Sequence, residues 1–245
     1  MKSFGITDKG KVRKDNQDSY IVEHCDKRKC AVIAVCDGMG GANAGDLASR
    51  LACKKFASDV FETLVSPSVF VGNHDALLRE SCSDANSTVY QYAQFDPSCD
   101  GMGTTLVGGV VYKRRAHIVN VGDSRAYHIT KSGIRQITRD HSYVEELVAM
   151  GAITREEAAH HPKKNVITRA LGIDSEVIAD YFDVELAKDE CILLCSDGLS
   201  NMVTDQEMFN AYTEQKNPNA ICNALMKLAL DRGARDNVSI VAVKV

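Results

Sequence analysis

The chain of 245 residues is long enough to bury a substantial core in one large domain, and no linker rich in proline or serine divides it. It has 29 basic and 33 acidic residues. The resulting net charge of −4 excludes the strongly positive surface that nucleic-acid-binding proteins carry. The first residues lack an apolar signal region and no apolar run approaches the ~20 residues of a membrane span, so we expect a cytoplasmic protein without nucleic-acid or membrane partners.

The nine cysteines argue against a disulfide framework. Their number is odd, no Cys-x-x-Cys pair is present, and Cys36, Cys191 and Cys195 lie inside apolar runs. We therefore expect reduced cysteines that belong to the core.

The first polar cluster, residues 11–18, lies between two short strand candidates at 4–6 and 20–22. Taken alone, it is consistent with a charged loop. Arg13 nevertheless offers a planar guanidinium that suits a phosphate group, and Asp18 places a carboxylate close to the start of a strand. Both residues are therefore candidates for a role in binding or catalysis.

The apolar run 31–36 leads into Asp37 and a series of glycines, and it predicts a strand buried on both faces. The run 191–195 leads to Asp197 in the same way, and a third apolar run begins just after Asp236. Asp-Gly is a common turn dipeptide, so any single copy is consistent with a plain turn. Three carboxylates at strand ends favour a shared site, which needs a hard cation such as Mg²⁺, Mn²⁺ or Ca²⁺ to offset their repulsion.

Periodic apolar residues then predict two long helices, over about 44–64 and 74–92. The glycine turn before the first helix suggests a dinucleotide-binding fingerprint, but Asn43 replaces the third glycine and Asp37 would place a negative charge at the pyrophosphate. A nucleotide-binding module is therefore a weak alternative.

Three further strands are predicted at about 106–112, 117–121 and 125–129. The short Gly122-Asp123 turn between the last two predicts a hairpin. Asp123 is then a fourth carboxylate at a strand end, although the role of an ordinary turn residue explains it equally well.

A polar segment over about 138–172 interrupts the strands and predicts a surface flap. Two capping-box patterns, which begin at Ser142 and Thr154, predict two short helices within it. Its three histidines, His141 among them, suggest a metal site, but an adjacent pair at a helix end points in different directions. We therefore expect solvated histidines.

The last third returns to strands near 178–184 and 191–195. Capping signals at Thr204 and Asn217 then predict two helices, the second of which ends near Gly233. Helix pairs between runs of hairpin-connected strands indicate a layered α+β domain and not an alternating βαβ one.

Six short motifs occur in order along nearly the whole chain: Arg13-x-x-Asn16-Gln17-Asp18, Asp37-Gly-Met-Gly-Gly41, Gly101-x-Gly-Thr-Thr105, Val121-Gly-Asp-Ser-Arg125, Ser196-Asp-Gly198 and Asp236-Asn237. Together they resemble the metal-dependent serine/threonine protein phosphatases of type 2C, particularly the compact bacterial ones. The resemblance implies an α+β four-layer αββα sandwich, in which two central, mainly antiparallel sheets carry a helix pair on each outer face. It also implies a single domain over 1–245, with a flap at about 138–172.

The resemblance implies a binuclear Mn²⁺ or Mg²⁺ centre at one end of the sandwich. Asp37 matches the carboxylate that bridges both ions, and the carbonyl of Gly38 matches a ligand of one of them. Asp197 and Asp236 match ligands of the other ion. Asp123, together with Asp197, matches a site for a third, looser ion.

The same comparison of motifs assigns roles around the ions. Asp18 matches an acid that holds metal-bound water, Arg13 matches the arginine that grips the phosphate, and Asn237 follows a ligand and can orient it. Met39 stands where animal members have a histidine proposed as the general acid, so the group that protonates the leaving oxygen is not assigned. Gln17 stands where some relatives have glutamate.

The function implied is hydrolysis of phosphoserine and phosphothreonine in proteins by a metal-activated water, in opposition to a cytoplasmic serine/threonine kinase that is itself a candidate substrate. We expect a monomer. Two cations ~4 Å apart lower the pKa of a shared water, so no protein nucleophile is needed. In agreement, no cysteine heads a Cys-x₅-Arg arrangement. A catalytically silent regulator with the same fold is the alternative from another class.

Overall fold

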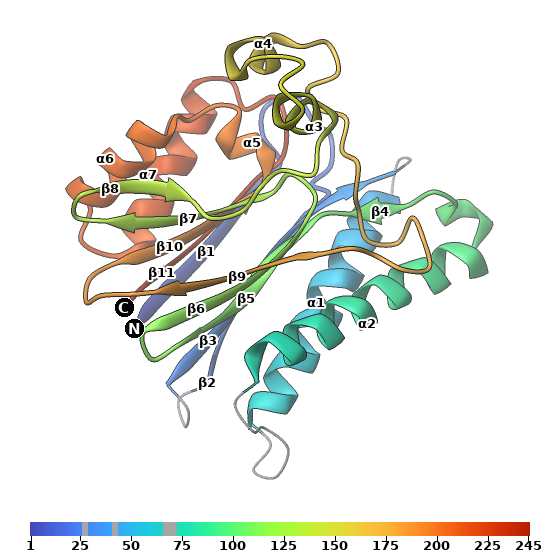
Figure 1. Ribbon diagram of the computed structural model, residues 1–245, viewed down its shortest axis with the longest axis horizontal. Coiled ribbons are helices and arrows are strands. Elements are labelled where there is room, and N and C mark those ends of the chain that lie inside the picture. The colour runs from blue at the N-terminus through green and yellow to red at the C-terminus, as the bar shows by residue number, and fades with distance from the viewer. Residues whose placement is uncertain (26–28, 41–43, 66–72) are drawn as a thin grey trace.

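The computed structural model describes residues 1–25, 29–40, 44–65 and 73–245, and its strands form two sheets (Figure 1). Gly41 and Asn43 of the predicted glycine turn lie outside the described residues. The five-stranded sheet has the order β1 (Lys2–Asp8), β11 (Val238–Lys244), β10 (Cys191–Cys195), β7 (Arg125–Thr130) and β8 (Gly133–Gln136). The six-stranded sheet has the order β2 (Asp18–Cys25), β3 (Cys30–Met39), β5 (Leu106–Tyr112), β6 (Arg115–Val121) and β9 (Asp180–Glu185), and β4 (Gly103–Thr104) pairs with β3.

Helix pairs cover the outer faces of both sheets, which confirms the expected αββα sandwich (Figure 1). The helices α1 (Ala44–Val65) and α2 (His74–Phe95) pack on the six-stranded sheet, and α6 (Asp205–Glu214) and α7 (Pro218–Asp231) pack on the five-stranded one. The shorter helices are η1 (Pro97–Cys99), α3 (Tyr143–Ala149), α4 (Arg155–His160) and α5 (Asp197–Ser200). None of the helices in the described ranges combines the length and apolar character needed to cross a membrane.

The side chains of β3 alternate between two cores, as expected for a strand that is buried on both faces. Val32 and Cys36 pack toward α1 and α2, whereas Ile33 and Val35 pack between the two sheets. The same alternation places Asp37 on the side of β3 that faces the other sheet. The strand therefore delivers this carboxylate to the end of the layer between the sheets.

The predicted hairpin at the Gly122-Asp123 turn is wrong. The strand before it, β6, pairs with β5 and β9, whereas the strand after it, β7, pairs with β10 and β8 in the other sheet. Gly122 has φ = +103°, and a Cβ there would lie 2.5 Å from Cγ2 of Thr105, so the crossing between sheets needs glycine. Turn residues between two apolar runs do not reveal whether both strands stay in one sheet.

The segment between β8 and β9 contains the two expected short helices. Thr154 begins α4 with the predicted capping box. Ser142 caps α3 by accepting the Glu145 N–H, but the Glu145 carboxylate binds Arg139 and Arg155 instead of the cap backbone. The first capping box is therefore only half formed, because two guanidinium groups compete for its acid.

His141 is buried, contrary to the expectation of a solvated ring, and only 5% of it is exposed. Its Nδ1 accepts the Gly122 N–H at 3.1 Å, and its Nε2 lies 3.2 Å from Oδ2 of Asp180 and 3.3 Å from Nη1 of Arg169. Burial lowers the pKa of His141. This histidine therefore joins the crossing between the sheets to the segment that leads into β9.

Candidate metal centre

Asp18 and Asp37 lie opposite each other on neighbouring strands. The antiparallel register pairs Asp18, the first residue of β2, with Asp37 near the end of β3. Directly opposed residues of an antiparallel pair hold their Cβ atoms about 5 Å apart. The six-stranded sheet thereby brings together two carboxylates that belong to different sequence motifs.

Asp197 and Asp236 reach the same end of the sandwich from the other sheet. Asp197 begins α5 just after β10, Asp236 comes just before β11, and these two strands are neighbours. The two segments touch closely, because a Cβ on Gly198 would lie 2.0 Å from the carbonyl oxygen of Asn237. The glycine after Asp197 is thus required for this packing.

Asp18 is buried, the other four acidic side chains are partly buried, and these carboxylates repel one another. Burial raises the pKa of Asp37 well above its ordinary value, and the charges of Asp18, Asp197, Asp123 and Asp236 raise it further. Burial, with help from neighbouring acids, raises the pKa of Asp18 to about 7 and that of Asp123 to about 7. Burial and the charge of Asp236 also raise the pKa of Asp197. The structure therefore places all five acidic side chains near one another.

The carboxylate oxygens include two that are buried without a hydrogen-bond partner, Oδ1 of Asp18 and Oδ1 of Asp197. Their second oxygens are bonded: Ser196 donates to Oδ2 of Asp18 at 2.7 Å, and Asn201 donates to Oδ2 of Asp197 at 3.0 Å. Buried, unpaired oxygens on carboxylates that repel one another are unfavourable without a cation. The donors are all oxygen, which fits Mn²⁺ or Mg²⁺.

The acidic groups do not yet surround an ion: no three carboxylate, imidazole or thiolate groups of the described residues enclose one in their present positions. Nη2 of Arg13 lies 2.7 Å from Oδ2 of Asp236 and forms an ion pair with that carboxylate. The two side chains are 53% and 37% exposed, respectively, and exposed ion pairs of this kind are weak. Asp236 can therefore turn from Arg13 toward a cation at small cost.

The loop that carries Arg13 is fixed by Asn237. The Asn237 side chain donates to the carbonyl oxygens of Lys9 at 2.9 Å and Asp15 at 3.0 Å, and it accepts the N–H of Gln17 at 2.8 Å. Asn237 is 4% exposed. In this structure it positions the loop, a contact that its place after Asp236 in the sequence does not reveal.

Gly38 lies where β3 meets the first turn of α1. A Cβ on Gly38 would lie 2.0 Å from the carbonyl oxygen of Gly45 and 2.6 Å from that of Gln17. The Gly38 N–H donates to the Gln17 carbonyl at 3.1 Å. Only glycine allows the helix and the β2 segment to approach the residue after Asp37 so closely.

A cavity of about 380 Å³ opens beside Asp123 and Asp197 and is bordered by the segment that contains α3 and α4. Arg155, Lys164 and Asn165 from that segment line it. The sequence analysis did not single out these three residues. The polar character of the predicted flap is the signal that points to them, but it does not tell which side chains face the acidic cluster.

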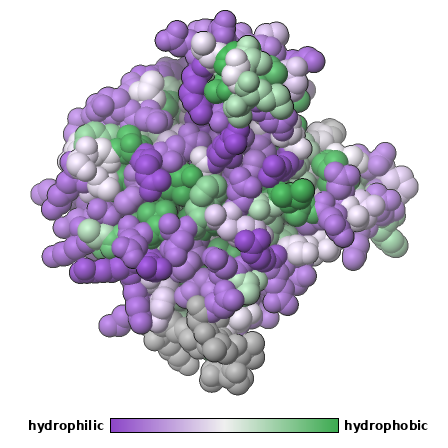
Figure 2. All heavy atoms as spheres, in the orientation of Figure 1, coloured by the Kyte–Doolittle hydropathy of each residue, from purple (hydrophilic) through white to green (hydrophobic). Residues whose placement is uncertain are grey.

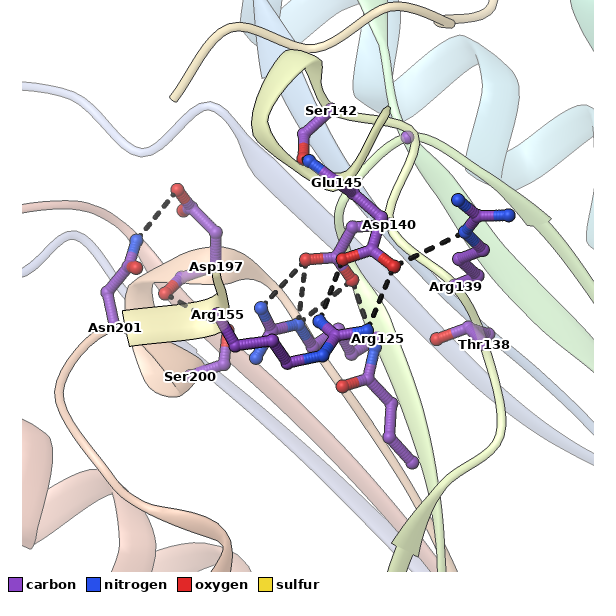
Figure 3. A network of polar contacts seen from close by, with 12 residues as sticks. Arg125, Thr138, Arg139, Asp140, Ser142, Glu145, Arg155, Asp197, Ser200 and Asn201 are labelled. Carbon is purple, nitrogen blue, oxygen red and sulfur yellow. Dashed lines mark hydrogen bonds and ion pairs between the residues drawn. The ribbon is translucent and has the colours of Figure 1, made fainter. Parts of the chain in front are cut away.

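Arg125 and Asp140 form a second contact that the sequence analysis missed. Nε of Arg125 lies 3.0 Å from Oδ1 of Asp140, and Nη2 lies 2.7 Å from Oδ2, in a bidentate pair (Figure 3). Planar guanidinium and carboxylate groups hold each other in a fixed orientation in such pairs. The pair therefore fixes the segment that begins at Asp140 beside the crossing that carries Asp123.

Comparison with known proteins agrees with this geometry. The family model described as Protein phosphatase 2C matches residues 9–224. The serine/threonine phosphatase stp of Listeria welshimeri is 36% identical over 239 residues, which cover 97% of this chain and 93% of the relative.

Solved structures show the same likeness. The serine/threonine phosphatase Stp1 from Staphylococcus aureus matches with a TM-score of 0.90 and 36% identity, over 99% of this chain and 94% of that one. The catalytic domain of the phosphatase PstP, in complex with two manganese ions, matches with a TM-score of 0.85 and 34% identity, over 100% of this chain and 98% of that one. The chain described here belongs to the protein phosphatase 2C family.

Proposed function

We propose that this protein phosphatase hydrolyses phosphoserine and phosphothreonine in proteins at a pair of Mn²⁺ or Mg²⁺ ions. Asp37 would bridge the ions, the Gly38 carbonyl would bind one, and Asp197 and Asp236 would bind the other. Asp123 would help to hold a third, weaker ion. The observation that carries the proposal is the group of mutually repelling carboxylates, two of whose oxygens are buried with no hydrogen-bond partner among the described residues.

Two bound divalent ions would supply an activated water and neutralise phosphoryl oxygens, so the chain itself does not have to supply a nucleophile. The cysteines agree with this. All nine are buried, as the sequence predicts. Burial raises the pKa of Cys82, Cys191 and Cys195 to about 12 each, which disfavours the thiolate that a cysteine-based phosphatase needs.

Asp18 and Arg13 would complete the chemistry. Asp18 has one bonded oxygen and one unpaired oxygen, and it lies opposite Asp37 on the neighbouring strand. Its unpaired oxygen would accept a hydrogen bond from the attacking water. Arg13 is half exposed at the rim of the same site and offers a guanidinium to the phosphate oxygens of a substrate. The substrates would include targets of a serine/threonine kinase and the kinase itself.

The proposal is tested by phosphate release from a phosphothreonine peptide. We expect turnover with Mn²⁺, loss of turnover after EDTA treatment, and recovery when Mn²⁺ is added back in excess. The unfolding temperature should rise with Mn²⁺ in the same samples, because an ion that binds only the folded state stabilises it. Equal turnover with and without the chelator would rule out the proposed metal centre.

Replacing Arg13 by alanine should lower kcat/KM for the peptide by about 10- to 100-fold, because a charge-assisted hydrogen bond to the phosphate is lost. Arg13→Lys should recover part of the activity, since it restores the charge but not the planar fork. Lys14→Ala, which removes an exposed charge from the next position, is the matched control. A similar loss in both alanine variants would show a general charge effect and not a specific contact.

A further inference from the structure

An apolar groove lies next to the acidic cluster, on the segment between α4 and β9. It has a volume of about 480 Å³. Its apolar lining comes from Met39, Ile167, Ala170, Ile173, Val177 and Ile178, and Thr168, Arg169, Asp174 and Glu176 complete the lining. Ile173 is 43% exposed and Ile178 is 74% exposed. Figure 2 shows hydrophobic patches among hydrophilic atoms on the face that this segment crosses. A groove of this size is suited to a few side chains of a bound molecule.

The groove lies close to the proposed metal centre along β3. Its floor includes Met39, which lies two residues after Asp37 on β3, about 7 Å along the strand, with its side chain on the same face. A Cβ on Gly103 would lie 2.7 Å from Cε of Met39 and 2.9 Å from Cδ1 of Ile173. The missing side chain of Gly103 therefore leaves the space that Met39 and Ile173 fill together.

The segment between α4 and β9, which forms the wall of the groove, is hydrogen-bonded to β4, the strand that pairs with β3. Thr104 donates through Oγ1 to the carbonyl oxygen of Asp37 at 2.9 Å, and its backbone exchanges hydrogen bonds with Leu171 at 2.8 and 3.1 Å. The wall is thus tied to the strand that carries the central carboxylate.

Asn86 on α2 fixes the next turn of the wall. It is 1% exposed, accepts the Gly172 N–H at 2.8 Å, and donates to the carbonyl oxygens of Asp174 at 3.0 Å and Ser175 at 3.2 Å. These bonds order the turn before any ligand binds, so binding in the groove carries no entropy cost for ordering it.

We propose that the groove binds an apolar side chain of the phosphoprotein substrate, one to three residues from the phosphorylated residue, and so sets sequence preference. The inference rests on the proposed function. An extended peptide rises about 3.3 Å per residue, so a chain whose phosphate lies at Asp37 passes the groove within a few residues. A second copy of this chain fits less well, because stable dimers bury about 800 Å² on each partner, more than a groove of this size offers.

The test compares two phosphothreonine peptides that differ only at the three positions on each side of the phosphothreonine, which are leucine in one and serine in the other. We expect the wild-type protein to prefer the leucine peptide by about tenfold in kcat/KM, as burial of one aliphatic side chain implies. The double variant Ile173→Ser/Ile178→Ser should reduce this ratio to about twofold or less. Ile173→Val/Ile178→Val should keep most of it.

The control variant is Val65→Ser. Val65 is 40% exposed at the far end of α1, about 30 Å from the first turn of that helix beside Gly38. It should leave the preference unchanged. Turnover of p-nitrophenyl phosphate, which is too small to reach the groove, reports separately on the catalytic centre.

Equal use of the two peptides by a wild-type protein that also hydrolyses p-nitrophenyl phosphate would overturn the groove proposal and leave the proposed function intact. Failure to hydrolyse any of the three substrates with Mn²⁺ would overturn both. A preference that appears only at protein concentrations where sedimentation detects a dimer would assign the groove to a second copy, against the proposal.

Discussion

Replacing Asp37 by asparagine should lower the turnover of a phosphothreonine peptide by about 1000-fold or more, since both proposed ions would lose their common ligand. Asparagine keeps the size of the side chain and leaves the backbone bonds of this residue in place. These are the N–H donated to Thr105 Oγ1 and the carbonyl that accepts from Thr104 and Thr105. The variant therefore tests the charge and not the fold.

The same substitution should stabilise the metal-free protein. The folded state at pH 8 either holds a buried charge at Asp37 next to Asp18 and Asp197 or binds a proton there, and both cost free energy relative to the unfolded chain. Removing the carboxylate should raise the free energy of unfolding in EDTA by on the order of 2 kcal/mol. The stabilisation by Mn²⁺ should largely disappear.

These opposite effects separate a metal ligand from a structural residue. A residue that only supports the fold would lose activity and stability together when replaced. Asp231→Asn, which removes an exposed carboxylate at the end of α7, should change neither quantity by a measurable amount. An Asp37→Asn protein that still turns over the peptide, or that keeps the full Mn²⁺ stabilisation, would refute the assignment of Asp37 as the shared ligand.

The local patterns of the sequence predicted the elements that depend on nearby residues. The burial of β3 on both faces, the caps at Thr154 and Thr204 and the proline start of α7 all occur as predicted. Each signal arises from residues within one or two turns, where propensity and hydrogen bonding to the adjacent backbone decide the structure. The carboxylates at strand ends belong to the same class of signal.

Long-range pairing limited the prediction. The crossing at Gly122 looked like a hairpin because the sequence does not tell which strands become neighbours. His141 looked solvated because its partners Gly122 and Asp180 lie in distant elements. The groove beside Met39 was missed for a similar reason, since its wall comes from a segment far along the chain.

The metal-free protein should lose stability as the pH rises from 5 to 8. The pKa of Asp18 is about 7 in the folded state and near 3.8 when the residue is in its ordinary environment, and Asp123 behaves in the same way. The folded state therefore binds more protons than the unfolded chain between these values, so the stabilisation is complete below about pH 4 and is lost as the pH passes about 7. His141, whose pKa is lowered by burial, acts in the opposite direction below about pH 6.5.

Urea unfolding in EDTA should show a decrease in the free energy of unfolding on the order of 2–5 kcal/mol between pH 5 and pH 8. Asp18→Asn should flatten the curve, because it removes one of the four carboxyls whose pKa is raised, while His141 remains. A flat wild-type curve in EDTA would contradict the prediction.

Saturating Mn²⁺ should reverse the trend, because an ion competes with protons for the same oxygens and therefore binds more tightly as the pH rises. The stabilisation by Mn²⁺, measured as the difference between the two curves, should grow steadily from pH 5 to pH 8. This growth links the unusual pKa values of Asp18 and Asp123 to their proposed use: the repulsion that weakens the metal-free fold is the same interaction that a divalent ion relieves. A stabilisation that does not depend on pH would place the ion away from these carboxylates.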